Sequence, residues 1–159
     1  MVPHTDIFPH RERLLGQWGV VDVRDALTAV REYGALGMLD PSRAMIRGGG
    51  PTVLSALAAA PDAFLAGTSI AGVSDLLSLQ AKLPKFESHH LVKYVGGSPE
   101  EDWRLWWDRS PISRAGDIRA PLLVSDHAMC LERCHKAVMP AKLMWMYRYC
   151  MAKMTLSCL

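Results

Sequence analysis

The sequence predicts an α/β fold with a mostly parallel sheet flanked by helices, and three observations support this prediction. Short apolar runs typical of strands alternate with segments whose apolar residues recur every three or four positions, as on one face of a helix. Glycine and proline residues separate these segments. The connections between the strand candidates are long enough to hold the crossover helix that parallel pairing requires. Because we find only three strand candidates, we expect part of a larger sheet.

A predicted helix over residues 20–36 begins the organised part of the chain. Its apolar residues recur at spacings of three and four, and Asp22 can cap its start. Gly34 and Gly37 offer left-handed positions where the helix can end. A turn then leads into the apolar run 44–46, which we interpret as a buried strand.

A glycine turn is predicted to connect this strand to a second helix. Gly48, Gly49 and Gly50 follow the strand, and the apolar residues of 52–60 again have helical spacing. Pro51 suits the first position of a helix, where its missing N–H costs little. The pattern is therefore a strand, a glycine turn and a helix.

The remaining elements before residue 125 are predicted from shorter patterns. We expect a strand at 64–70, a helix at 74–82 and a last strand at 121–124. Between the last two lies the tryptophan-rich stretch 87–111, which we expect to be irregular.

Composition excludes several classes of protein. The chain has 18 Lys and Arg against 16 Asp and Glu, a formal net charge of +2 without a concentrated basic run, so we expect no nucleic-acid partner. No apolar stretch approaches the roughly 18 residues of a membrane-spanning helix, and charged residues in the first fifteen positions argue against a secretory signal. We therefore expect a cytoplasmic protein that does not insert into membranes.

The composition changes abruptly near Ser125. All four cysteines and six of the nine methionines follow this residue, whereas no glycine does. Clear periodicity also fades there, so we place a boundary between 124 and 125.

Several dispersed motifs occur in the order found in one enzyme family. They include Gly16-Gln17-Trp18-Gly19, Ile46-Arg47-Gly48-Gly49, Arg109-Ser110-Pro111-Ile112 and Pro121-Leu122-Leu123-Val124. Together these motifs resemble the catalytic domain of the prolyl oligopeptidase family of serine peptidases, particularly its acylaminoacyl-peptidase and dipeptidyl-peptidase-like members. The resemblance covers about residues 11–124 and implies an incomplete α/β-hydrolase fold, a peptide substrate, an acyl-serine intermediate and no cofactor. Residues 1–10 and 125–159 do not match, which divides the chain into three segments.

The sequence departs from the family where the nucleophile is expected. The family's turn reads Gly-Gly-Ser-x-Gly-Gly plus a bulky residue, whereas only Gly48, Gly49, Gly50 and Pro51 precede Thr52 here, an interval three residues shorter. The nucleophilic serine is among the missing residues, so the three glycines are interpreted as a remnant of the nucleophile turn. We assign no catalytic residue. The other serines nearby, Ser42 and Ser55, lack the position that the chemistry requires.

The partners of that serine are not recognisable either. Cys130 stands at the offset where the family has its aspartate, and the pair Asp126-His127 is out of register. His135 lacks the usual surroundings of the family's histidine. Because losing one member of such a triad already removes several orders of magnitude in rate, we expect no turnover of the family's type.

Four other groups of residues could have a function, and each also has a structural interpretation. His127, Cys130, Cys134 and His135 could bind zinc, but their spacing matches no common zinc module, so we favour buried or incidental thiols. The tryptophans of the stretch 87–111 could form a ligand platform, although core or interdomain packing is the commoner role of such residues. The pair His89-His90 is interpreted as part of a solvated loop. The basic and aromatic tail, residues 141–159, could form a helix that lies on a membrane surface, but the polar face of such a helix is poorly defined.

The sequence thus favours a truncated serine-peptidase relative that is inactive as written. The alternative is a pseudoenzyme or interaction protein that associates with a full-length relative, or with itself, through its unfinished sheet edge or its tryptophan-rich surface. A change in exon boundaries or reading frame would account for both the short turn and the divergent tail.

Overall fold

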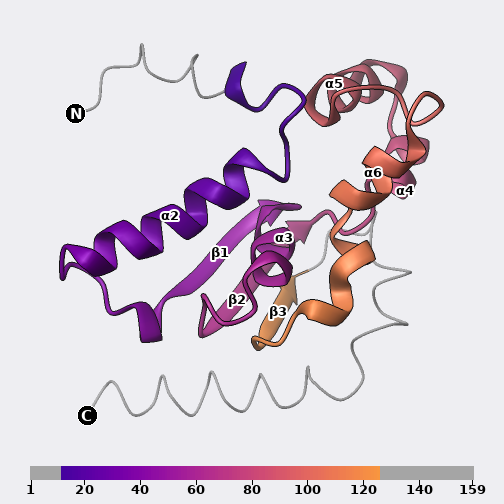
Figure 1. Cartoon of the computed structure of the whole chain (residues 1–159). Coiled ribbons are helices and arrows are strands. Elements are labelled where there is room, and N and C mark those ends of the chain that lie inside the picture. Colours follow the sequence, from indigo (N-terminus) through magenta and orange to yellow (C-terminus); the bar gives the residue numbers. More distant parts are fainter. Residues whose placement is uncertain (1–11, 126–159) are drawn as a thin grey trace.

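The computed structural model describes residues 12–125, which contain a three-stranded sheet and a set of helices (Figure 1). Helices and strands alternate over the first half of this range, as predicted. In chain order the elements are α2 (Val21–Ala35), the 3₁₀ helix η2 (Pro41–Arg43), β1 (Met45–Gly50), α3 (Thr52–Ala59), β2 (Ala66–Gly72), α4 (Leu76–Lys82), α5 (Lys85–Val95), α6 (Trp103–Arg109), the 3₁₀ helix η3 (Pro111–Asp117) and β3 (Leu122–Ser125).

The three strands are parallel and follow one another in the order β1-β2-β3. Ile46 pairs with Gly67, and Gly67 pairs with Leu122 on its other side. The register shifts between Gly48 and Gly50, where β2 contains one more residue than β1. This arrangement confirms the predicted α/β class with a parallel sheet.

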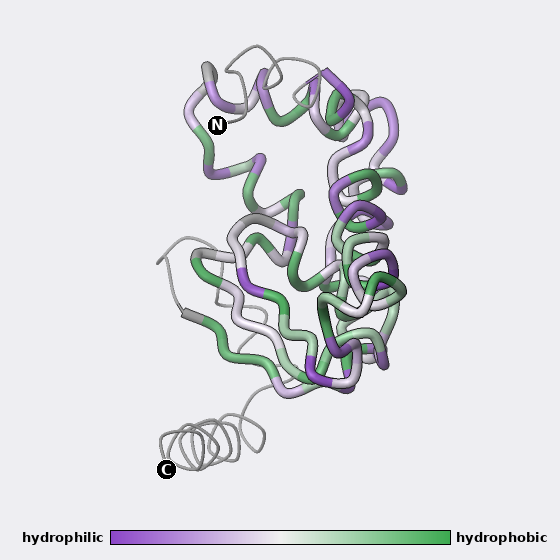
Figure 2. The backbone as a smooth tube through the Cα atoms, turned by 90° about the vertical axis from the view of Figure 1, so that its left-hand side faces the viewer, coloured by the Kyte–Doolittle hydropathy of each residue, from purple (hydrophilic) through white to green (hydrophobic). Residues whose placement is uncertain are grey.

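Helix α3 packs closely on one face of the sheet. A Cβ atom added to Gly67 would lie 2.6 Å from Leu57 Cδ1, so the glycine makes room for the leucine of α3. Leu57 is fully buried, and α2 packs onto the same core. In Figure 2 the strands run through the lower left of the tube and the helices packed on them lie to their right, so the sheet and these helices form two layers.

The opposite face of the sheet carries apolar side chains that the described helices do not cover. Met45 of β1 is 59% exposed, Leu123 of β3 is 41% exposed and Ile70 of β2 is 37% exposed. The prediction that residues 44–46 form a fully buried strand was therefore wrong for Met45. Met45 is exposed because β1 lies at an edge of the described sheet, where one face and one side of the strand have no neighbour.

A second apolar cluster lies among α4, α5 and α6. Trp106 of α6 is fully buried there against Leu76 of α4 and against Leu91 and Val95 of α5. The stretch 87–111, predicted to be irregular, thus contains most of α5 and all of α6. The helices are short, and each buries only one or two apolar residues, so their periodicity is faint in the sequence.

Backbone conformation explains where two helices end. Gly37 has φ +69° just after α2, and Gly96 has φ +106° at the end of α5, so both occupy the left-handed region that favours glycine. Gly34 does not: a Cβ atom there would lie 2.6 Å from Pro41 Cγ, so close packing accounts for this glycine. Among residues 12–125, no helix is long and apolar enough to cross a bilayer.

Candidate functional site

The junction between β1 and α3 is the place where the sequence predicts a remnant of a nucleophile turn. The strand runs through Gly50, Pro51 takes the N-cap position, and α3 begins at Thr52. Gly48 and Gly49 thus extend the strand instead of forming a turn, and neither has a positive φ. Since glycine and proline have no reactive group, these residues supply no nucleophile.

Close packing explains the glycine at position 49. A Cβ atom added there would lie 3.0 Å from the carbonyl oxygen of Ile70, on the neighbouring strand. This close approach coincides with the register shift between β1 and β2. The glycine therefore has a structural role at this junction, independent of any catalytic one.

A carboxylate links the starts of α2 and α3. Asp22 accepts a hydrogen bond of 2.7 Å from the backbone N–H of Gly19 and another from the hydroxyl of Thr52. The N-cap of α2 is Val20, which makes no side-chain cap, so the predicted capping role of Asp22 was wrong in its geometry. Asp22 lies inside the first turn and binds backward to the chain before the helix. It thereby holds the first residue of α3 against α2.

Arg109 ties the end of α6 to the chain before α2. Its guanidinium donates hydrogen bonds of 2.8 Å to the carbonyl oxygen of Trp18 and 3.4 Å to that of Gly16. Partial burial lowers the pKa of Arg109 from its ordinary value, and the charge of Asp22 raises it in opposition. Arginine keeps its charge under such a shift, so this contact persists at all physiological pH values.

Two buried serines differ in whether their hydroxyl groups have hydrogen-bond partners. Ser110 Oγ accepts a hydrogen bond of 3.0 Å from the N–H of Leu76 and donates one of 2.7 Å to the carbonyl of Trp106. Ser69, which pairs with Gly48, is fully buried, and its hydroxyl has no hydrogen-bond partner within the described segment. Neither serine lies on the strand-to-helix junction.

The serines that the sequence analysis considered as nucleophiles lie in ordinary structural positions. Ser55 is half-buried in the first half of α3 and lines a cavity of about 50 Å³ with Asp108 and Arg109. The described residues around this cavity include no histidine. Ser42 is exposed on η2, where its hydroxyl donates a hydrogen bond of 2.6 Å to Asp40.

The tryptophans of α6 divide between core and surface. Trp106 is fully buried, and its indole N–H donates a 3.0 Å hydrogen bond to the carbonyl of Gly97. Trp103 is 57% exposed and Trp107 is 40% exposed, and the guanidinium of Arg104 lies 5.8 Å from the ring centre of Trp103. Packing therefore accounts for Trp106, whereas the other two rings face outward.

The histidines and the predicted metal ligands fall in different parts of the chain. His89 and His90 lie on α5, so the prediction of a solvated loop there was wrong in its secondary structure. Within residues 12–125, no three His, Cys, Asp or Glu side chains form a group that could hold a metal ion. The possible zinc ligands lie outside the described residues, namely His127, Cys130, Cys134 and His135.

Sequence reasoning missed the contacts that join distant motifs. Asp22 and Thr52 are thirty positions apart, and Arg109 binds a loop more than ninety positions before it. Helical periodicity carries no information about such pairs. The available signal was the family resemblance itself, because Gly16, Trp18 and Arg109 all belong to the motifs that carried it.

Comparison with known proteins assigns this chain to a family. The profile of the prolyl oligopeptidase family matches residues 9–131. Dipeptidyl aminopeptidase BIII of Pseudoxanthomonas mexicana is 31% identical over 120 residues, an alignment that covers 71% of this chain and 17% of the relative. The chain thus spans about a sixth of the length of this curated relative.

Two solved structures match the fold as well as the sequence. A puromycin-hydrolyzing peptidase of Mycobacterium tuberculosis is 41% identical, with a TM-score of 0.66 over 72% of this chain and 18% of that protein. The acylaminoacyl peptidase of Pyrococcus horikoshii is 25% identical, with a TM-score of 0.64 over 86% of this chain and 22% of that protein. Both neighbours are peptidases, and the described sheet and helices correspond to part of each. By sequence and by fold, the chain belongs to the prolyl oligopeptidase family.

Proposed function

We propose that this chain is a non-catalytic member of its peptidase family. One observation carries the proposal: β1 passes into α3 through Gly48, Gly49, Gly50 and Pro51, none of which has a hydroxyl or thiol group. An acyl-serine mechanism needs a nucleophile at such a junction, with a base in reach. Peptide binding remains the role that the family suggests, without cleavage.

The position of Ser55 supports the same proposal. Its hydroxyl is the nearest one along the chain after that of Thr52, which donates to Asp22. Ser55 follows the junction by one helical turn and lines a cavity with an acidic and a basic side chain. A nucleophilic serine is activated by a base that is itself oriented by a third group, and the described residues that line this cavity do not form that arrangement.

Labelling with a serine-directed fluorophosphonate tests the proposal. The full 159-residue chain is incubated with the probe beside an active peptidase of the same family, and labelling is quantified by intact-mass spectrometry. We expect stoichiometric labelling of the active enzyme and none of this chain. Stoichiometric labelling that disappears in Ser55→Ala or Ser42→Ala would overturn the proposal, and peptide mapping would identify the serine.

A second candidate function is association with a longer relative, and the open face of the sheet favours it. Met45, Ile70 and Leu123 expose between 37% and 59% of their surface on that face. Strand β1 also has an unpaired side within the described sheet. Exposed apolar surface and free strand edges recruit partners. In this proposal residues 11–124 act as an interaction module, and 125–159 form a separate segment.

Co-purification of this chain with a full-length family member tests the second function. We expect a complex on size-exclusion chromatography, weakened by Leu123→Lys, which places a charge on the open face. The matched change Leu36→Lys alters a side chain that is 69% exposed beyond the end of α2 and should leave the complex intact. A well-behaved monomer that binds no relative would contradict this candidate.

A further inference from the structure

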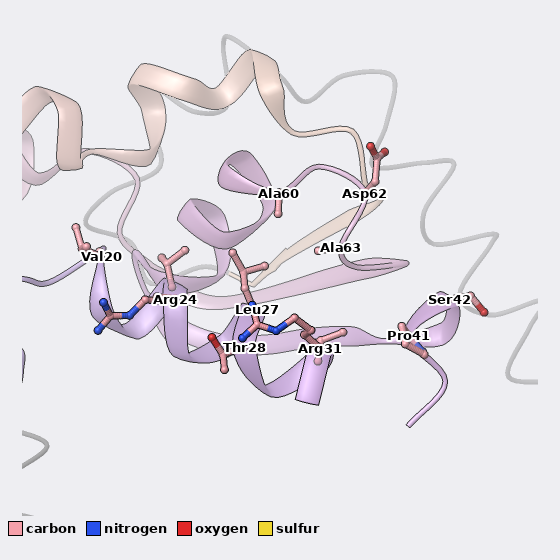
Figure 3. Close-up of a pocket in the computed structure, with 13 residues that line it drawn as sticks. Val20, Arg24, Leu27, Thr28, Arg31, Pro41, Ser42, Ala60, Asp62 and Ala63 are labelled. Atoms are coloured by element: carbon pink, nitrogen blue, oxygen red, sulfur yellow. The ribbon is translucent and has the colours of Figure 1, made fainter. Parts of the chain in front are cut away.

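An open groove runs between α2 and the segment that follows α3 (Figure 3). Its volume is about 820 Å³, which falls in the range of small-molecule sites. It lies apart from the junction of β1 and α3, because none of Gly48, Gly49, Gly50 and Pro51 lines it. The groove is therefore a candidate binding site separate from the junction of β1 and α3.

The walls of the groove are mainly apolar. Val20, Val23, Leu27 and Val30 form one wall as a stripe along α2, and ten residues of helix correspond to about 15 Å. The opposite wall has small side chains, chiefly those of Ala60 and Ala63. The apolar side chains follow the axis of α2, so the groove can accommodate an extended aliphatic chain along the helix.

The charged side chains at the groove are two arginines and one aspartate. Arg24 and Arg31 lie seven positions apart on α2, on the same side of the helix. Arg31 is paired with Glu32 at 2.9 Å, whereas the guanidinium of Arg24 makes no hydrogen bond or ion pair with any described residue. The acidic side chain Asp62 lies at the other end of the groove from Arg24 (Figure 3). The end near Arg24 thus offers a free positive charge beside apolar surface.

We propose that this groove binds an aliphatic carboxylate, with the chain along the stripe of α2 and the carboxylate on Arg24. Burial of the methylene chain against valine and leucine side chains supplies most of the affinity. A guanidinium forms two parallel hydrogen bonds with a carboxylate, so Arg24 orients the ligand. The volume of about 820 Å³ lies in the range of small-molecule sites, which favours a small molecule over a protein segment.

Dodecanoate is the probe, and methyl NMR of the full chain is the measurement. We expect saturable shifts of the Val23 and Leu27 methyl signals at millimolar ligand or below. The methyl signals of Val95, in the cluster around Trp106, serve as the internal reference and should not move. Dodecan-1-ol, which has the same chain without the charge, should bind more weakly.

Substitution of the free arginine provides the matched test. Arg24→Gln should weaken dodecanoate binding about three- to fivefold, the range for an exposed ion pair, while the affinity for dodecan-1-ol stays unchanged. Arg104→Gln makes the same chemical change on α6, away from the groove, and should leave both affinities unchanged. Equal affinity of Arg24→Gln and the parent chain for dodecanoate would overturn the assignment of the carboxylate.

Two further outcomes would overturn the whole proposal. Unmoved Val23 and Leu27 signals at saturating dodecanoate would show that the groove binds no such ligand. Shifts of these signals with protein concentration, in the absence of ligand, would show that a second copy of the chain occupies the groove. Circular dichroism of each variant confirms that the comparison is made between folded proteins.

Discussion

The cluster around Trp106 and the junction at Pro51 differ in how completely their polar groups are satisfied. Trp106 is fully buried, its indole N–H binds the carbonyl of Gly97, and its own carbonyl accepts the hydroxyl of Ser110. At the junction, α3 begins without a side-chain cap. Beside it, Ser69 is buried with no hydrogen-bond partner among residues 12–125. The polar groups named around Trp106 all have hydrogen-bond partners, whereas those at the junction are only partly satisfied within the described segment.

The difference teaches that motifs shared with the family have structural roles in this chain. Arg109, Ser110 and the loop at Gly16 belong to motifs that carry the family resemblance, and their contacts hold helices and loops together. These contacts stabilise the fold whether or not a nucleophile is present. At the junction, close packing of Gly49 and the bond between Thr52 and Asp22 likewise involve no nucleophile. Membership of the family therefore predicts the architecture better than the activity.

The largest effect on the free energy of unfolding is expected at Trp106, in the centre of its cluster. Trp106→Ala removes a fully buried ring and leaves the carbonyl of Gly97 without its donor, so we expect a loss of about 3–5 kcal/mol in the free energy of unfolding. Trp103→Ala on the same helix removes a ring that is 57% exposed and should cost much less. Urea denaturation followed by circular dichroism measures both. Equal losses for the two variants would contradict the assignment of Trp106 as the centre of this cluster.

The two buried serines allow the same substitution in each region. Ser110→Ala deprives the N–H of Leu76 and the carbonyl of Trp106 of their partner, at an expected cost of about 1–3 kcal/mol. Ser69→Ala removes a buried hydroxyl that has no partner in the described segment, so its effect should lie within about 0.5 kcal/mol of zero or be stabilising. The same urea titrations compare them. A loss in Ser69→Ala as large as in Ser110→Ala would show that Ser69 has a partner.

The fold of the first half of the described chain could be predicted from the sequence because its elements are long or well marked. Periodic apolar positions over 20–36 predicted α2 within a residue at each end, and the helix at 52–60 corresponds to α3. The second half was harder. The sequence shows little apolar periodicity over α5 and α6, because packing around Trp106 stabilises these helices more than local pattern does.

The candidate site could be predicted only in part. The absence of a hydroxyl between Arg47 and Thr52 is evident from the sequence, but the extension of β1 through Gly50 is not, since glycine has low strand propensity. Pairing with β2 overrides that propensity. The bond between Asp22 and Thr52 depends on how two helices pack, which no local rule describes.

The smallest effect is expected just before β1, where the side chain of Asp40 caps η2. In contrast, α3 begins after β1 at Pro51 without a side-chain cap. The hydroxyl of Ser42 and then its backbone N–H hold the pKa of Asp40 below its ordinary value of 3.8. Ser42→Ala removes the hydroxyl, so the pKa of Asp40 should rise toward that value, as measured by carbon-detected NMR titration. Ser55→Ala removes a hydroxyl elsewhere and should leave the pKa of Asp40 unchanged.

The direction of the pH dependence follows from the sign of this shift. Because the pKa of Asp40 is lower in the folded chain than its ordinary value of 3.8, the ionised carboxylate stabilises the fold above that pH. The contribution is lost as the pH falls through the lower, folded-state pKa. The thermal midpoints of the parent chain and Ser42→Ala should therefore differ slightly at neutral pH and converge in acid. A difference that grows on acidification would mean that the hydroxyl of Ser42 stabilises η2 by a route other than its bond to the carboxylate of Asp40.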